Sequence, residues 1–106
     1  MVEPLLSRVA IYVVSAKNFV DRQCSIAEQM SKDDLEFEFI WEFDADELST
    51  DDLARFGQQT MRPEAKSCVL KHLEAQSLLL RSDKDACLIL EDDAILSKTF
   101  KHDLKQ

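Results

Sequence analysis

Hydrophobic and polar positions follow two different periods along this chain, and each period predicts one kind of element. Residues 8–14, RVAIYVV, are β-branched or apolar after Arg8, which predicts a strand covered on both faces. Residues 35–43, LEFEFIWEF, alternate apolar with acidic side chains, and only Ile40 breaks the pattern. They predict a strand with one wet face, at the edge of a sheet. Residues 86–90, ACLIL, predict a third, short strand.

Helical spacing of apolar residues marks the segments between these strands. Asn18 is suited to cap a helix that extends to about Ser31, with a buried stripe of Val20, Cys24, Ala27 and Met30. Pro63 opens the strongest helix, which extends to about Arg81. Its predicted buried stripe consists of Ala65, Cys68, Val69, His72, Leu73, Gln76, Leu79 and Leu80.

Two weaker helical segments complete the order of elements. Residues 44–59 are polar and predict a surface connection, with a short helix capped at Ser49 or Thr50 and ended by Gly57 at its C′ position. Ser97 predicts the cap of a last helix through Leu104.

The order strand, helix, strand, short helix, long helix, strand, helix predicts an α/β sandwich with right-handed crossovers. With the alternating strand at the edge, the short, mostly parallel sheet has the order 2-1-3, and residues 1–106 form a single domain. The first and third strands then lie side by side with connections that leave to opposite faces. Ligands of open α/β sheets bind at such a switch point.

Composition excludes several classes of function. The chain contains one glycine, so a glycine-built phosphate loop is excluded, and its net charge of −8 argues against nucleic acid and anionic lipid as partners. Its first residues lack the basic leader and cleavage site of a signal peptide, and no membrane span is expected. Cys24, Cys68 and Cys87 lie in periodic apolar segments, which predicts reduced core thiols in a cytoplasmic protein.

Three consecutive acids, Glu91, Asp92 and Asp93, directly follow the third strand, and Ser15 follows the first. Taken alone, such a triplet is more typical of a solvated turn than of a metal site. At a switch point, however, clustered carboxylates also suit a phosphate that is bridged by Mg²⁺ or Mn²⁺. The apolar stripe that contains His72 likewise favours a core histidine.

Four segments in order along the chain resemble glycosyltransferase family 25, which includes lipooligosaccharide galactosyltransferases of bacteria and related collagen-modifying enzymes. They are VAIYVVSAKNFVDR (9–22), EFEFIWEFDADEL (36–48), PEAKSCVLKH (63–72) and LILEDDAILSKTF (88–100). Ser15 replaces the family's asparagine, and both glycines and the serine of the third segment are replaced.

The resemblance implies the N-terminal, donor-binding half of a GT-A-like nucleotide-sugar-binding fold. It implies a UDP-sugar donor, a lipooligosaccharide or other glycan acceptor, and a Mn²⁺ or Mg²⁺ ion held by Glu91 and Asp93 in the role of a DxD motif. It places five further residues at the donor site: Ser15, Arg22, Asp44, His72 and Asp92.

The same resemblance leaves a second function open, because it covers only the donor half of such an enzyme. The chain could instead be a non-catalytic remnant or interaction module that retains the fold. A sheet that ends after the third strand also has an open edge, which another copy, a second polypeptide or further sequence would have to cover. Self-association as a homo-oligomer is therefore one hypothesis.

Overall fold

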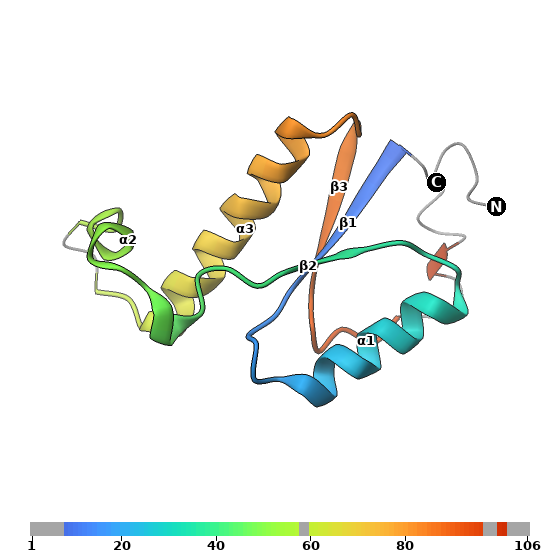
Figure 1. Cartoon of the computed structure of the whole chain (residues 1–106), viewed down its shortest axis with the longest axis horizontal. Helices are drawn as coiled ribbons and strands as arrows, with labels where there is room; N and C mark the ends of the chain where they lie inside the picture. Colours follow the sequence, from blue (N-terminus) through green and yellow to red (C-terminus); the bar gives the residue numbers. More distant parts are fainter. Residues whose placement is uncertain (1–7, 58–59, 97–99, 102–106) are drawn as a thin grey trace.

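The computed structural model describes residues 8–57, 60–96 and 100–101, and its centre is a parallel sheet of three strands (Figure 1). The strands are β1 (Val9–Val14), β2 (Glu38–Ile40) and β3 (Ala86–Glu91). The helices are α1 (Val20–Lys32), α2 (Thr50–Ala54) and α3 (Pro63–Arg81), and a 3-10 turn, η2 (Ala45–Glu47), precedes α2. The strand order is β2-β1-β3, so the predicted α/β class and sheet order are confirmed.

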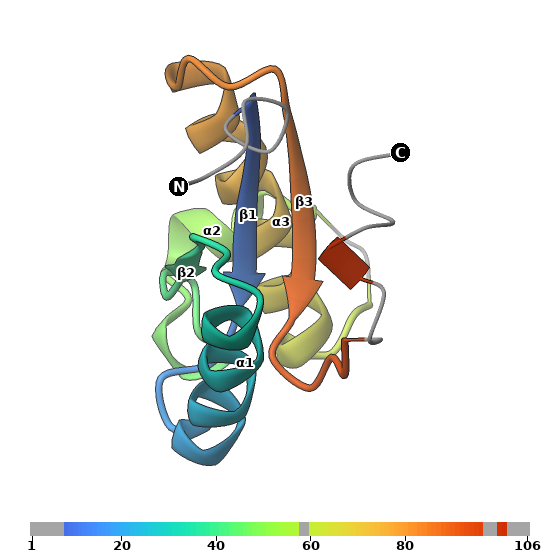
Figure 2. The same ribbon diagram turned by 90° about the vertical axis from the view of Figure 1, so that its right-hand side faces the viewer.

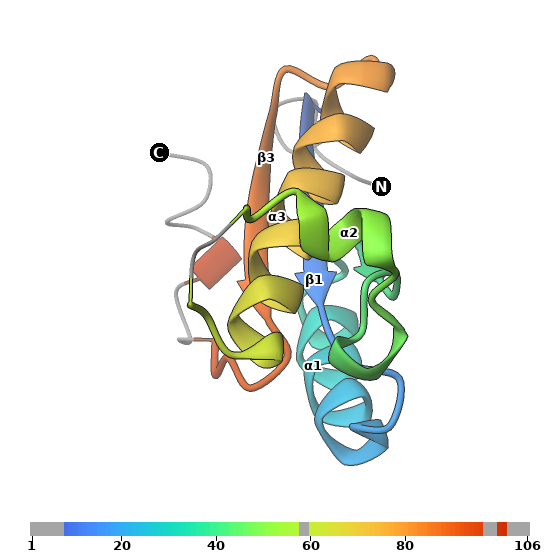
Figure 3. The ribbon, with the colours of Figure 1, turned by 90° about the vertical axis from the view of Figure 1, so that its left-hand side faces the viewer.

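The central strand, β1, pairs in parallel with both neighbours and supplies the core on both faces of the sheet. Its last residue, Val14, lies opposite Ile40 of β2 and Glu91 of β3. Successive side chains point to opposite faces, so Val13 packs in one cluster with Met30 of α1, and Val14 packs in another with Ala75 of α3. Figures 2 and 3 show the two helices on opposite sides of the sheet. This layering directs the carboxyl ends of β1 and β3 to a common edge.

The edge strand β2 is shorter than predicted, but its second face is wet as predicted at the exposed glutamates Glu36, Glu38 and Glu42. Only Glu38–Ile40 pairs with β1, although the alternation extends from residue 35 to residue 43. Phe43 has a φ of 71°, a left-handed conformation that no strand can continue through. Ile40, which breaks the alternation, is completely buried in the cluster on the α3 side.

The predicted helix caps are right for α2 and wrong for α1. Ser49 caps α2 through a reciprocal pair of hydrogen bonds with Asp52, at 3.0 and 2.9 Å. In contrast, Phe19 is the N-cap of α1, and no side chain caps that helix, so the cap predicted at Asn18 is absent. Gly57 has a φ of +58° but lies two residues beyond the C-cap of α2, one position later than predicted. The cap predicted at Ser97 lies outside the described residues.

Helix α1 also turns a different face to the sheet than predicted. Met30 is buried as predicted, but the other buried residue is Ile26, which was not in the predicted stripe, whereas Val20 is 58% exposed and Cys24 is exposed. Cys24 lies about 200° around the helix from Ile26, at about 100° per residue, so it cannot share the buried face. All three cysteines are free thiols, as predicted, but Cys68 and Cys87 are half-buried, so none is a fully buried core residue.

Helix α3 has the predicted length but buries a neighbouring face. Its buried residues are Ser67, Leu70, Lys71 and Ala75. Five members of the predicted stripe are instead exposed: Ala65, Val69 (39%), Leu73 (42%), Gln76 and Leu80 (85%). Relative to the prediction, α3 is therefore rotated about its axis so that Lys71 faces the sheet. The groups that bind this lysine lie in the loops that follow β1 and β2. No helix in the described part of the chain, α3 included, is long and apolar enough to cross a membrane.

Candidate functional site

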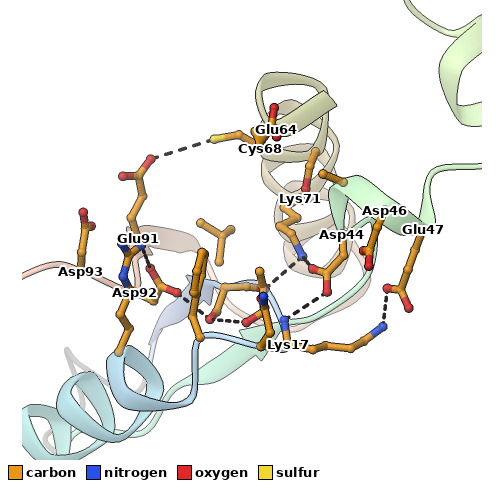
Figure 4. Close-up of a pocket in the computed structure, with 18 residues that line it drawn as sticks. Lys17, Asp44, Asp46, Glu47, Glu64, Cys68, Lys71, Glu91, Asp92 and Asp93 are labelled. Atoms are coloured by element: carbon orange, nitrogen blue, oxygen red, sulfur yellow. Dashed lines mark hydrogen bonds and ion pairs between the residues drawn. The ribbon is translucent and has the colours of Figure 1, made fainter. Parts of the chain in front are cut away.

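A cleft of about 540 Å³ opens at the carboxyl ends of β1 and β3 (Figure 4). Its walls come from the turn after β1, from η2, from the first turns of α3 and from the acidic triplet after β3. The chain leaves β1 toward α1 on one face of the sheet, whereas α3 covers the other face. The cleft therefore lies at the predicted switch point between the first and third strands.

A buried hydrogen bond ties the two strand ends together at the base of this cleft. The Ser15 hydroxyl donates to Oδ2 of Asp92 at 2.7 Å, and both residues are buried. The side-chain amide of Gln23 donates to Ser15 Oγ at 3.2 Å and to the Ala16 carbonyl at 2.7 Å. Two residues predicted from the sequence, Ser15 and Asp92, are thus brought into contact. The sequence analysis missed Gln23, which holds the turn after β1 in place.

Arg22 lies at the mouth of the cleft and partly exposes its charge. Its guanidinium Nη1 is 3.6 Å from Oδ1 of Asp92, and its Cζ lies 4.4 Å from the centre of the Phe19 ring. Half of the Arg22 side chain is exposed. The cation–π contact with the ring helps to hold the guanidinium at the cleft, where a group with five N–H donors suits an anionic ligand.

Asp44 is buried on the opposite side of the cleft floor, at the end of the segment that follows β2. Its Oδ1 lies 2.7 Å from the Lys71 ammonium, and the backbone N–H of Lys17 donates to Oδ2 at 3.1 Å. Burial raises the pKa of Asp44, but the hydrogen bonds from Lys71 and Lys17 outweigh it and hold the pKa below its usual value of 3.8. Asp44 is therefore an ionised acceptor at neutral pH.

Lys71 is the main functional residue that the sequence analysis missed. Its side chain is 5% exposed, and its ammonium donates to the carbonyls of Ser15 (3.0 Å), Trp41 (3.1 Å) and Glu42 (2.9 Å) as well as to Asp44. Three N–H donors thus serve four acceptors, so at least one proton is shared. One signal pointed to it: Lys71 stands where the family segment has a serine.

The outer two acids of the triplet behave differently from Asp92. Glu91 and Asp93 are exposed residues in the wall of the cleft. Figure 4 shows Glu91 extending toward Cys68. The Oε1 atom of Glu91 lies 4.0 Å from the sulfur, whereas Asp92 accepts the hydrogen bond from Ser15. Burial raises the pKa of the Cys68 thiol, and the negative charge of Glu91 raises it further. His72 is half-buried beside this pair and is not part of the cleft wall.

The geometry therefore assembles most of the predicted donor residues, in two groups. Ser15, Arg22 and Asp92 meet on one side of the cleft, and Asp44 lies on the other, joined through Lys71 to the Ser15 carbonyl. His72 belongs to a separate cluster on the rim.

The cleft falls inside a region that is similar to a known family. A family model described as glycosyltransferase family 25 (LPS biosynthesis protein) matches residues 9–106, which include every strand and all of the cleft wall. No curated protein matches the chain.

Proposed function

The chain belongs to glycosyltransferase family 25, a family of lipopolysaccharide biosynthesis, and from this premise we propose that the cleft binds the UDP-sugar donor of a glycosyl transfer. The observation that carries the proposal is the buried Ser15–Asp92 hydrogen bond at the switch point. It brings the end of β1 and the acidic triplet together where open α/β sheets bind nucleotides. We also propose that this sheet belongs to the donor half of a GT-A-like fold, an assignment that the parallel strand order 2-1-3 supports.

The size and charge of the cleft suit a nucleotide sugar. About 540 Å³ is within the usual range for small-molecule sites, roughly 300–1,000 Å³. Arg22 offers charged donors to a phosphate, and the ionised Asp44 can accept hydrogen bonds from ribose or sugar hydroxyls. Acidic residues outnumber basic ones in the cleft wall, and Lys17 and Lys71 are already paired with Glu47 and Asp44, so a diphosphate needs a further cation there.

Mn²⁺ or Mg²⁺ is the proposed cation, and the donor chemistry of Glu91 and Asp93 fits it. Hard divalent ions prefer oxygen ligands and are commonly held by one or two carboxylates together with substrate phosphates. Both side chains are exposed and can turn toward a bound diphosphate. When bound, the ion would neutralise charge that develops on the leaving phosphate.

The remaining residues would position these ligands. The bonds from Ser15 and Arg22 hold Asp92, and Asp92 in turn fixes the backbone between Glu91 and Asp93. Lys71 joins the turn after β1 to the segment after β2, so both sides of the cleft keep their separation. We place this activity in the cytoplasm, since all three cysteines are free thiols.

Isothermal titration calorimetry with UDP in the presence and absence of Mn²⁺ tests the proposal. We expect UDP to bind, with tighter binding when Mn²⁺ is present, and we expect Asp93→Asn to weaken that binding by about tenfold or more. Glu36→Gln is the matched control, because it removes an exposed acid that is not part of the cleft wall. No heat of binding would refute donor binding, and equal affinities for Asp93→Asn and the control would refute the proposed role of Asp93 in holding the ion.

The replaced residues of the third family segment favour a second candidate, a binding module without transferase activity. Ser67 and Lys71, which stand in place of a glycine and a serine, both hydrogen-bond to the loop after β2. An assay of UDP release from UDP-sugars separates the two functions. UDP binding without turnover on donor and glycan acceptor supports the module, whereas measurable transfer or donor hydrolysis excludes it.

A further inference from the structure

Three side chains of different chemistry meet on the rim of the cleft, where α3 faces the end of β3. The sulfur of Cys68, a ring nitrogen of His72 and a carboxylate oxygen of Glu91 all lie within 4.8 Å of one another. Ligands of a tetrahedral zinc ion lie about 3.3–3.7 Å apart, as bond lengths of about 2.0–2.3 Å require. Small side-chain rotations therefore convert the present arrangement into a coordination shell.

The three residues sit on regular elements, which limits how far they can separate. Cys68 and His72 are four residues apart on α3, so they lie one above the other on the same face of the helix. Glu91 is the last residue of β3, which packs against α3. Sites built on helices and strands hold their geometry more precisely than sites on loops.

The ligand set selects a different metal from the one proposed for the diphosphate. Thiolate and imidazole favour borderline metals such as Zn²⁺, whereas Mg²⁺ and Mn²⁺ prefer oxygen ligands alone. In the metal-free chain the Cys68 thiol donates toward Oε1 of Glu91 at 4.0 Å (Figure 4). A bound cation would replace that proton and attract both the thiolate and the carboxylate. Three protein ligands leave a fourth position for water or another donor.

We propose that Cys68, His72 and Glu91 form a zinc site on the rim of the cleft. The site is formed by the chain alone and does not depend on nucleotide binding. Glu91 would then be shared, because one of its carboxylate oxygens would bind zinc and the other would remain available, with Asp93, to the hard ion that accompanies the donor. Zinc at this position would pin the first half of α3 to the end of β3 and so stiffen one wall of the cleft.

Titration of the reduced, metal-free chain with Co²⁺, followed by absorption spectroscopy, tests the site. Tetrahedral cobalt bound to a thiolate gives intense visible bands and a near-ultraviolet charge-transfer band. We expect both at one equivalent and expect Zn²⁺ to displace them. Cys68→Ser should abolish the charge-transfer band, and His72→Ala should weaken metal affinity by about tenfold or more.

The other two cysteines provide matched controls. Cys24→Ser and Cys87→Ser should retain the charge-transfer band, because neither thiol belongs to the cluster. No band in the unaltered chain, or a band that survives Cys68→Ser and disappears in Cys24→Ser, would overturn the proposal.

A second measurement needs no substitution and so does not depend on how a variant folds. Alkylation of the unaltered chain, analysed by mass spectrometry, should be slowed by Zn²⁺ at Cys68 and unchanged at the exposed Cys24. Equal rates at Cys68 with and without zinc would contradict the site. UDP binding without a cobalt band refutes the zinc site alone, and a cobalt band without UDP binding refutes donor binding alone.

Discussion

At the scale of single residues, one buried ammonium organises the floor of the cleft. Lys71 reaches from α3 to three backbone carbonyls and one carboxylate in the segments after β1 and β2. Between these segments the backbone N–H of Ser15 donates to the Ile40 carbonyl at 3.4 Å, and the lysine adds donors for the carbonyls of Ser15, Trp41 and Glu42. Removing it would leave the Asp44 charge buried without its partner, which is the costly way to break a buried ion pair.

We expect Lys71→Met to lower the free energy of unfolding by about 3–5 kcal/mol, because the Asp44 carboxylate loses its compensating charge. Urea denaturation followed by circular dichroism measures the change. The matched control is Lys32→Met, which removes an ion pair with Glu28 in which both side chains are at least 72% exposed. That change should cost at most about 0.5 kcal/mol. Similar costs for the two variants would contradict the structural role of Lys71.

Asp44 should give the chain a specific sensitivity to acid. Its pKa is lower in the folded chain than the ordinary 3.8, so the unfolded chain binds more protons between these two values and stability rises with pH there. The contribution of the ionised Asp44 carboxylate to the free energy of unfolding is complete above about pH 4, and it is lost as the pH falls through the pKa of Asp44 in the folded chain. Denaturation midpoints of Asp44→Asn should therefore vary less with pH in this window than those of the unaltered chain. Glu36→Gln is the reference variant. If the midpoints of Asp44→Asn vary with pH as much as those of the reference, other carboxylates cause the loss of stability in acid.

Some of these residues could be predicted from the sequence, and others could not. Ser15 and Asp92 were identifiable because each directly follows an apolar strand, and strand ends of a parallel sheet meet at one edge. Lys71 was not, because lysine is rarely buried and its partners here are mostly backbone carbonyls. No spacing in a sequence records such contacts. Gln23 escaped prediction for the same reason.

At the scale of elements, α3 shows that hydrophobic spacing can locate a helix and still mistake its orientation. Pro63 and the length of the periodic segment predicted its bounds correctly. Its orientation depends on two polar side chains, Lys71 and Ser67, whose hydroxyl donates to the Phe43 carbonyl at 2.5 Å. Satisfying these buried polar groups outweighs burying Val69 and Leu73.

Two leucines on this helix test its orientation. Leu70 is 1% exposed and Leu80 is 85% exposed, although hydrophobic spacing placed Leu80 in the core. Leu70→Ala should destabilise the chain by about 2–5 kcal/mol through lost burial and a residual cavity. Leu80→Ala should change stability by less than about 0.5 kcal/mol. Chemical denaturation measures both costs. A larger cost for Leu80→Ala than for Leu70→Ala would mean that α3 turns Leu80, and not Leu70, toward the core.

The length of β2 illustrates a different limit of pattern analysis. Alternation between residues 35 and 43 correctly placed Phe37 and Phe39 on one face, and the structure packs both against the core cluster that contains Met30 of α1. Backbone pairing is a separate property, because it requires a partner strand in register. β1 is six residues long, and the turn at Phe43 diverts the chain toward the cleft. Only three residues of β2 therefore form the ladder.

At the scale of the whole molecule, the described sheet is open beside β3. Within the described ranges β3 pairs only with β1, and its other edge carries no backbone ladder. The outer face of α3 exposes apolar side chains as well, including Leu73 and Leu80. Unpaired edges and exposed apolar surface both favour association, whereas the net charge of −8 opposes it.

We therefore expect the chain to self-associate at high concentration, and more strongly at high salt, because screening weakens the repulsion between acidic copies. Light scattering should give an apparent mass that rises above the 12.2 kDa of one chain as concentration and ionic strength increase. Leu80→Lys should shift the rise to higher concentration. A constant monomer mass under all these conditions would contradict the prediction.

The pairing of β1 with β3 also has a consequence for synthesis of the chain. The partners in the Ser15–Asp92 bond are 77 residues apart, so the ribosome makes the central strand long before its neighbour. At about 5–20 residues per second the delay is roughly 4–15 s. Throughout that interval the β-branched segment VAIYVV has an uncovered side, and we expect it to be the part of the nascent chain that chaperones hold.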